Sequence, residues 1–429
     1  MKRLAAIFLS LAMLITFLAG CEGKRDFLPT DGQSNMQSCE KSQAKNLMQN
    51  IQTQNVNGKN ADEKFIYAMT KFSLEIFKQL ANNSENALVS PLSIINCLAL
   101  VQNGADKDTL KQFEDTFKLD RHDMNLYLKS FNERLDKTKS VMQANSIWLD
   151  SSRFTPNQKF LQINADYFNA DIMSSDFNNP NTVNNINLWV KENTNNMIDE
   201  IVEKITPDTV MYLINALTFS ADWEEPYNDY QVIEGDFYSQ GSKIQQADYL
   251  SCTVYEYLEF KNAKGFKKQY KNRNLSFVAI LPDKNIDVID FLKDLDADTF
   301  INTVNNPINL GVTTQLPAFK AESDFSDEMI ESLTHLGIKD VFKPDRANLY
   351  SMGESASGEN IFVANIVHRT YFELTQNGTR AGAASAAVIY DTCVPNAEMI
   401  EISLTRPFAY AIVDNQTGLP IFMGTVLSL

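Results

Sequence analysis

The sequence predicts one large α+β domain with extended mixed β-sheets. Helix-like and strand-like segments are intermixed without the strict alternation of a doubly wound fold, and no internal repeat is visible. The chain has 429 residues, 44% of them hydrophobic, which is enough to bury a large core. Length alone would also allow two or three smaller domains, but the intermixing favours a single domain over residues 61–429.

Residues 1–20 are expected to be an export signal. Two basic residues at positions 2 and 3 precede an apolar run over residues 4–17, which is too short to span a membrane as a helix. The next four residues, Leu18-Ala19-Gly20-Cys21, resemble the bacterial lipobox, whose cysteine becomes the lipidated first residue of the mature protein. We therefore expect lipidation at Cys21. The alternative is an ordinary signal peptide with Cys21 as a bystander.

The residues after Cys21 bear on where the protein is anchored. Residue 22 is Glu and not the Asp that retains many lipoproteins at the inner membrane, so we expect the outer membrane of a bacterial envelope, on its periplasmic face or at the cell surface. Residues 21–60 are rich in Gln, Asn, Ser and Lys with few aromatic residues. This composition predicts a flexible, lipid-anchored tether.

Charge and cysteine content exclude several functions. Removing residues 1–20 leaves 36 of the 38 Lys and Arg against 54 Asp and Glu, a net charge of −18, which opposes binding of nucleic acid or glycosaminoglycan. The cysteines at 39, 97, 252 and 393 fit no metal or C-x-x-C pattern, so we expect no metal, cofactor or disulfide framework. With three histidines and none of the common hydrolase or nucleotide motifs, we expect a protein that is not an enzyme. We also expect a monomer.

Several segments of the domain carry clear signals. Ser90 followed by Pro91 predicts a helix start, because Ser caps free backbone N–H groups and Pro has none to lose, and Gly104 can end that helix. Helical spacing of apolar residues predicts a helix over 65–77. Alternating or continuous apolar runs predict strands at 145–150, 275–282 and 363–375.

The stretch Thr375–Ala387 is small and nearly uncharged. The ten residues after Gly378 include five alanines, one glycine, one serine and one threonine, and the glycines argue against a helix. Side chains this small suit a segment that slides between two strands over a packed core. The alternative is an Ala/Gly-rich surface linker.

The context of this stretch resembles the serpin family over most of residues 61–429. The family's hinge reads roughly Glu-Glu-Gly-Thr-Glu-Ala-Ala-Ala-Ala-Thr; here Gln376 and Asn377 replace the acidic pair and Arg380 replaces the second Glu. Asn86 to Ser93 resembles the family motif Asn-x-x-x-Ser-Pro-x-Ser. Further similar blocks follow in the expected order at 145–150, 167–177, 186–198, 211–227, 275–282, 316–319, 336–342 and 406–424.

The resemblance implies roles for individual residues. A buried hydrogen-bonding group beneath the central sheet, which the family calls the shutter, would comprise Ser90, Ser93, Asn187 and His368, and Trp223 would mark the breach, where the loop first enters. The hinge would comprise Gly378, Thr379, Ala381, Gly382, Ala383, Ala384 and Ser385. If the hinge becomes a strand, alternation points Thr379, Ala381, Ala383 and Ser385 inward and Arg380 outward.

The same resemblance implies a suicide inhibitor of endopeptidases, which bind covalently as an acyl-enzyme before the freed strand inserts. Counting as in the family places the cleaved bond between Thr392 and Cys393, within a window from Tyr390 to Asn396. A small Thr before the bond favours elastase-like or subtilisin-like serine proteases, while Cys393 leaves a cysteine protease open. The alternative is a non-inhibitory serpin-fold lipoprotein that binds or scaffolds a partner; the small hinge residues favour the inhibitor.

Overall fold

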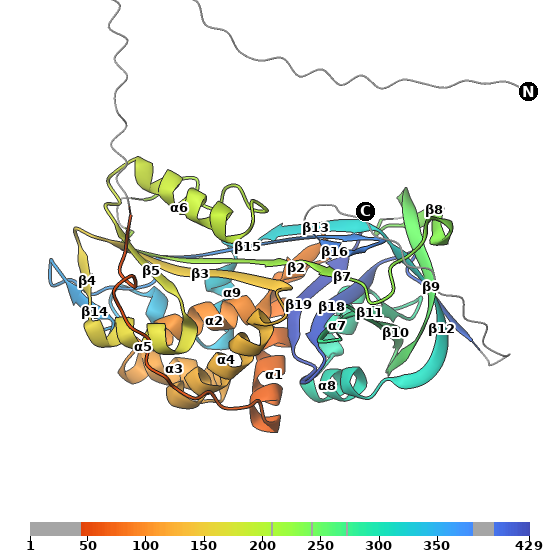
Figure 1. Ribbon diagram of the computed structural model, residues 1–429, viewed down its shortest axis with the longest axis horizontal. Helices are drawn as coiled ribbons and strands as arrows, with labels where there is room; N and C mark the ends of the chain where they lie inside the picture. Colours follow the sequence, from red (N-terminus) through yellow and green to blue (C-terminus); the bar gives the residue numbers. More distant parts are fainter. Residues whose placement is uncertain (1–43, 207–208, 242, 272, 381–398) are drawn as a thin grey trace, which may run out of the picture. The chain divides into compact units, whose positions relative to one another are not determined.

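The computed structural model describes residues 44–206, 209–241, 243–271, 273–380 and 399–429. These residues belong to one compact unit. Helices and two large sheets of mixed strand direction make up this unit (Figure 1), which confirms the predicted α+β fold.

The first sheet contains residues 378–380, the start of the predicted hinge. Its strand order is β1-β5-β3-β6-β15-β16-β7. Strand β13 pairs with the edge of β15 that faces away from β6 and β16. At its centre β6 and β15 run parallel and lie directly side by side. The bounds are β1 (Lys45–Asn46), β3 (Val141–Asp150), β5 (Asp171–Ser175), β6 (Met211–Phe219), β7 (Ala221–Asp222), β13 (Phe319–Asp324), β15 (Asn365–Thr375) and β16 (Gly378–Arg380).

The second sheet has the order β17-β12-β9-β10-β11-β18-β19-β2, and β8 pairs with β9. A further pair, β14 (Gly353–Ser355) with β4 (Phe154–Pro156), stands apart from both sheets. The bounds are β2 (Ala87–Val89), β8 (Val232–Tyr238), β9 (Ile244–Phe260), β10 (Ala263–Gln269), β11 (Leu275–Pro282), β12 (Ile308–Pro317), β17 (Ile400–Ser403), β18 (Phe408–Asp414) and β19 (Pro420–Val426).

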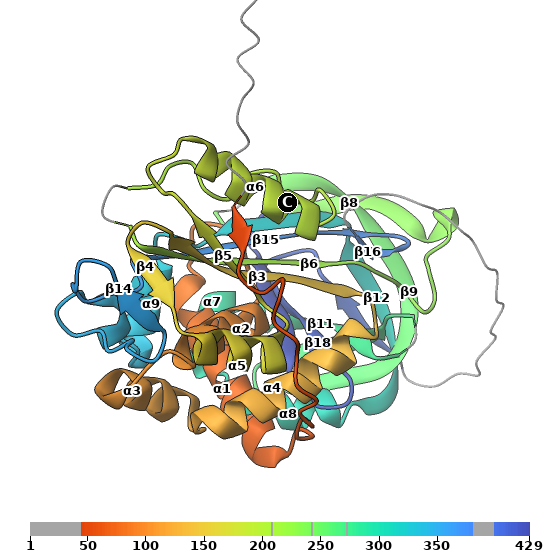
Figure 2. The ribbon, with the colours of Figure 1, turned by 60° about the vertical axis from the view of Figure 1, so that its left-hand side comes forward.

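Helices cover both faces of the first sheet. Figure 1 shows α6 (Asn181–Asn193) on one face and α2 (Pro91–Gln102) beneath the other, and Figure 2 shows the same layers after rotation. The remaining helices are α1 (Glu63–Leu80), α3 (Lys107–Phe117), α4 (Arg121–Asp136), α5 (Gln158–Phe168), α7 (Val288–Asp294), α8 (Ala297–Asn305) and α9 (Met329–Leu336), with 3₁₀ turns at Asp229–Gln231 and Asp340–Phe342.

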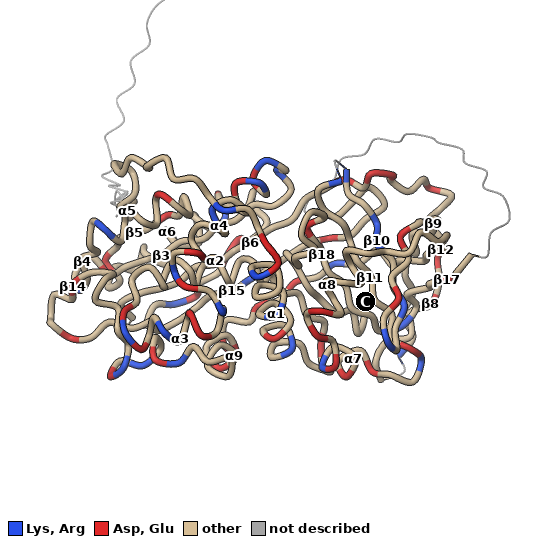
Figure 3. Tube along the Cα trace, turned by 90° about the horizontal axis from the view of Figure 1, so that it is seen from below, with Lys and Arg blue, Asp and Glu red and all other residues tan. Residues whose placement is uncertain are grey.

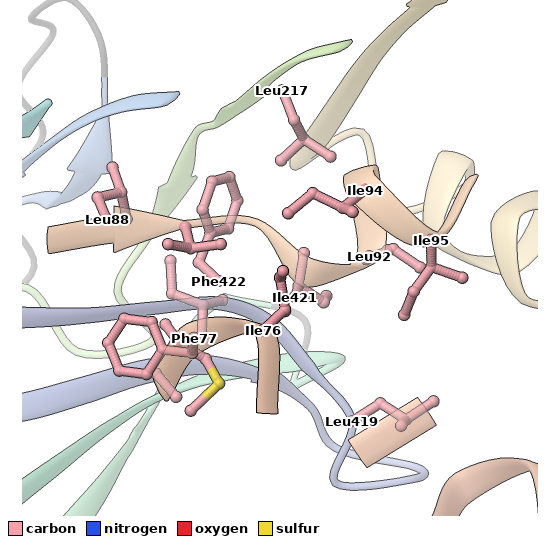
Figure 4. Close-up of a cluster of buried hydrophobic side chains, with 14 of the residues drawn as sticks. Ile76, Phe77, Leu88, Leu92, Ile94, Ile95, Leu217, Leu419, Ile421 and Phe422 are labelled. Atoms are coloured by element: carbon pink, nitrogen blue, oxygen red, sulfur yellow. The ribbon is translucent and has the colours of Figure 1, made fainter. Parts of the chain in front are cut away.

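Helix α2 is the structural centre of the core. As predicted, Ser90 caps it, with the Ser90 hydroxyl 3.3 Å from the Ser93 backbone nitrogen, and Pro91 occupies its first turn. All twelve residues of α2 are buried, because the helix lies against β3 and β6 of the first sheet and against β19 of the second sheet. Figure 4 shows apolar side chains from α1, α2, β6 and β19 meeting there, among them Ile94, Leu217 and Phe422. This packing fixes the N-terminus of α2 beneath β6 and β15.

The prediction of a flexible tether over 21–60 is wrong for residues 44–60. Lys45 and Asn46 pair with the edge strand β5, and farther along the Gln54 backbone N–H donates to the Asp166 carboxylate at 2.7 Å. The Lys59 N–H donates to the Leu126 carbonyl at 2.9 Å. Polar residues that lack apolar periodicity can still be fixed by backbone hydrogen bonds to an existing surface. Residues 21–43, including Cys21 and Cys39, lie outside the described residues.

Candidate functional site

The hinge begins inside the first sheet. Residues 378–380 pair antiparallel with β15, with Gly378 opposite Thr375 and Thr379 opposite Leu374, and residues 378–379 also pair with β7. Gly378 has a φ of +155°, and a Cβ there would lie 2.2 Å from the Ala221 carbonyl oxygen, so only glycine fits this approach.

Thr379 is fully buried, which is the direction that strand alternation predicted for this one residue. Its hydroxyl lies 2.6 Å from the hydroxyl of Tyr270. The other predicted hinge residues, Ala381, Gly382, Ala383, Ala384 and Ser385, and the predicted reactive bond between Thr392 and Cys393 lie outside the described residues.

Trp223 holds the turn that leads into the hinge. Its backbone N–H donates to the Asn377 carbonyl and its indole N–H to the Thr375 carbonyl, both at 3.0 Å. The ring is buried and stacks on Tyr270 with centroids 4.5 Å apart. The Tyr227 N–H donates to the Gln376 carbonyl at 2.9 Å. The segment that follows β7 therefore fixes the carbonyls of the two turn residues, Gln376 and Asn377, and the last carbonyl of β15.

A buried hydrogen-bonding cluster joins the two central strands to α2. His368 on β15 lies directly opposite Asn215 on β6, and the His368 Nδ1 is 2.7 Å from the Asn215 Oδ1. The Ser93 hydroxyl donates to the same oxygen at 2.5 Å, and the Asn215 amide donates back to the Ser93 carbonyl. Ser90 contributes its N–H, 3.4 Å from the His368 Nε2, and its hydroxyl donates to the Ile421 carbonyl. We call Ser90, Ser93, Asn215 and His368 the shutter cluster.

The hydrogen bonds assign one neutral form to His368. Because the Ser90 N–H donates to Nε2, Nδ1 must carry the proton that it donates to Asn215. Complete burial lowers the pKa of His368 to about 4, so the ring is neutral at physiological pH. The ring thus acts as a neutral bridge between β15, β6 and the cap of α2.

The prediction that Asn187 belongs to this cluster is wrong. Asn187 lies on α6, where its amide donates to the Val202 carbonyl at 2.8 Å and accepts from the N–H groups of Ile201 and Val202 at 2.9 and 3.0 Å. It fixes the segment after α6 and does not contact Ser90, Ser93 or His368. Asn215 takes its place. The sequence held a signal for this, since Asn215 is the one amide in the mostly apolar, fully buried strand Met211–Phe219, and a buried amide must find partners.

The shutter cluster does not have the geometry of a catalytic triad. The Nδ1 of His368 faces an amide and not a carboxylate, and all four members are fully buried. In the described part of the chain, no group of three or more His, Cys, Asp or Glu residues could hold a metal ion. The cluster instead links two neighbouring strands that share seven paired positions, Asn365–Tyr371 with Tyr212–Thr218.

Comparisons with known proteins agree with this architecture. The chain is 25% identical over 385 residues to an uncharacterized serpin-like protein of Thermococcus kodakarensis, covering 86% of each chain. It is 26% identical to the leukocyte elastase inhibitor of Homo sapiens, covering 84% of this chain and 98% of that one.

Among solved structures, the chain resembles the thermophilic serpin tengpin in its native state, with 42% identity, a TM-score of 0.86, and coverage of 90% of this chain and 100% of that one. The same comparison with tengpin in its latent state gives 40% identity and a TM-score of 0.77, over 87% and 100% of the chains. The family model described as serpin (serine protease inhibitor) matches residues 67–429. The chain therefore belongs to the serpin family.

Proposed function

We propose that this protein inhibits an endopeptidase by trapping it, with a cleaved loop that inserts between β6 and β15. The observation that carries the proposal is the antiparallel pairing of residues 378–380 with β15, which starts the strand whose continuation would separate β15 from β6. A protease that cleaves the loop would free this strand to extend. Family membership supports protease inhibition in general.

The register supports an inserted strand made of small inward residues. In the existing pairs the two residue numbers sum to 753, as in Thr379 with Leu374. Continued insertion in the same register would bring Ala381 opposite Phe372, Ala383 opposite Thr370 and Ser385 opposite His368. Those three partners on β15 are all buried. Small residues at the inward positions therefore match the packed side of the sheet.

Insertion would exchange one ladder for two. Over the seven positions where β6 and β15 now pair with each other, each strand would instead pair with the inserted strand. A net gain of roughly seven hydrogen bonds at about 0.5–1.5 kcal/mol each would stabilise the inserted form by about 4–10 kcal/mol. The uncleaved form is then held kinetically. The bond between His368 and Asn215 must break on the way, so the shutter cluster opposes premature opening.

The target class follows from the loop sequence. We place the reactive bond between Thr392 and Cys393, within Tyr390 to Asn396, and infer serine proteases with small-residue pockets, of the elastase or subtilisin type. The similarity to a leukocyte elastase inhibitor supports this inference. No Lys or Arg occurs between Arg380 and Arg406, so proteases that demand a basic residue should be poor targets.

We further propose that the protein is exported and anchored to a bacterial envelope membrane by a lipid at Cys21. Among the described residues no helix is long and apolar enough to cross a membrane. Figure 3 shows acidic and basic residues interspersed along the described trace, in keeping with a protein that does not bind nucleic acid or glycosaminoglycan. We also propose that the protein is a monomer.

The test incubates the mature domain with elastase, subtilisin and trypsin. We expect SDS-stable complexes with elastase or subtilisin, a cut mapped by mass spectrometry within residues 390–396, and no rapid complex with trypsin. Protein nicked in the loop should melt at a higher temperature than intact protein. Clean nicking without a rise in melting temperature would refute insertion and favour a non-inhibitory serpin-fold protein.

A further inference from the structure

A reactive pair lies beneath Trp223 and takes no part in the strand pairing of the hinge. Cys252 on β9 and Lys268 on β10 approach each other, with 3.8 Å between the lysine nitrogen and the thiol sulfur. The same ammonium lies over the rings of Tyr227 and Trp223, at 4.5 and 5.4 Å from their centroids. It also donates to the Glu225 carbonyl at 3.1 Å. An amine, a thiol and two aromatic faces therefore share one site.

The surroundings favour chemistry between the two groups. Lys268 is 6% exposed, so its amine is held in place beside the sulfur, whereas Cys252 is half-buried and can be reached by a small oxidant. The buried Tyr227 hydroxyl has no hydrogen-bond partner among the described residues. Burial, and then the neighbouring Cys252, raise the pKa of Tyr227 well above its usual range, so its hydroxyl stays neutral beside the sulfur.

We propose that Cys252 and Lys268 form a peroxide-driven sulfenamide cross-link. Hydrogen peroxide first transfers one oxygen to the Cys252 thiol, giving a sulfenic acid and water. The lysine ammonium releases a proton to solvent, its nitrogen attacks the sulfur, and the S–O bond breaks as the S–N bond forms. The departing hydroxyl leaves as water with the second proton of the amine. In total, a thiol, an ammonium and one peroxide give a sulfenamide, two waters and a proton, and the sulfur loses the two electrons that reduce the peroxide.

The cross-link would alter the support of the hinge turn. Trp223 and Tyr227 donate to the Asn377 and Gln376 carbonyls, and the Lys268 charge holds both rings. Conversion of the ammonium to a neutral S–N link removes that attraction to the rings. It also weakens the hydrogen bond to the Glu225 carbonyl, because the nitrogen loses its charge. The oxidised protein should therefore release its hinge more readily. This consequence rests on the proposed loop insertion, while the cross-link itself does not.

The test treats the full mature protein with near-stoichiometric hydrogen peroxide and maps its peptides after trypsin digestion. We expect the peptides that contain Cys252 and Lys268 to be joined at a mass about 2 Da below their sum, with cleavage after Lys268 lost and restored by dithiothreitol. C252S and K268R should abolish the joined peptide. K267R is the matched control, because Lys267 is equally buried but hydrogen-bonds to Val304. A sulfenic or sulfinic acid on Cys252 with Lys268 unlinked in the wild type would overturn the proposal.

A second measurement addresses the consequence for the hinge. The oxidised, uncleaved protein should melt about 1–3 °C lower than the reduced protein, and peroxide should not change the melting of K268R in this way. Unchanged melting of the cross-linked protein would overturn the effect on the hinge. Because the mass of the joined peptide does not depend on any protease, failure of the proposed inhibition would be seen separately, as the absence of a protease complex.

Discussion

The register of the proposed inserted strand can be tested by placing one carboxylate on either face. Ala381→Glu puts it opposite Phe372, which is fully buried, whereas Ala384→Glu puts it opposite Arg369, which is part-exposed and already lies near Glu322 and Asp324. The two variants have the same charge and size and differ only in the side of the strand on which the new group would lie.

The expected penalty for the inward group is large. A fully buried carboxylic acid commonly has a pKa of about 8–9, compared with about 4.3 in water. Keeping it protonated at pH 7 then costs roughly 4 kcal/mol, at about 1.4 kcal/mol per pH unit. This is comparable to the lower end of the about 4–10 kcal/mol expected from the second ladder. If half of the cost acts in the transition state, insertion slows by roughly 30-fold.

Gel electrophoresis in SDS reads the outcome directly. A slower insertion lets the acyl-enzyme hydrolyse, so Ala381→Glu should give mostly cleaved protein and little protease complex, with a smaller rise in melting temperature after nicking. Ala384→Glu should form the complex as the wild type does. Equal loss of the complex in both variants, or full activity of Ala381→Glu, would show that the register or the insertion itself is wrong.

Three further predictions address other parts of the protein. The pKa of His368 in the folded protein, about 4, lies below the value of about 6.5 in the unfolded chain. The free energy of unfolding should therefore fall by up to about 3 kcal/mol as the pH drops from about 6.5 towards 4. Thermal melts should show this loss, and His368→Gln should make the melting temperature less dependent on pH over this range. Cys21→Ala should move the protein from the detergent fraction to the aqueous fraction, and unchanged partitioning would argue against the lipid anchor. Asn187→Ala should lower the melting temperature of uncleaved protein by removing three hydrogen bonds, and should leave the loss of stability at low pH unchanged. Asn215→Ala should change the loss of stability at low pH.

Local chemistry explains which parts of the fold could be predicted from the sequence. The start of α2 follows from Ser90 and Pro91, because capping depends on residues next to each other in the chain. The inward direction of Thr379 follows from strand alternation alone. Resemblance to a family placed His368 and Trp223, and both lie where the geometry gives them partners from distant segments.

The predictions that were wrong concern contacts between segments far apart in the sequence. Asn187 and Asn215 are both amides within predicted elements, and only the packing of α2 against β6 and β15 decides which one meets His368. Residues 44–60 lack an apolar pattern, so nothing local predicts that Lys45 and Asn46 will extend a sheet edge. Edge pairing uses backbone groups, which are the same for every residue type except proline.

The described structure places two opposing features on the same strand. At one end of β15, residues 378–380 already pair with it, so an inserting strand would not need a new nucleus. At its middle, His368 and Asn215 close the path of that strand through a buried hydrogen bond that also engages the cap of α2. Opening the path exposes a polar group that must be satisfied again, which costs about 1–3 kcal/mol until the new strand supplies a partner. Ser385, which the continued register brings opposite His368, is of a type that can supply that partner, since its hydroxyl both donates and accepts. A barrier of this kind is highest before the strand arrives and falls once it is in place, which is what the proposed trap would require in order to stay closed until cleavage.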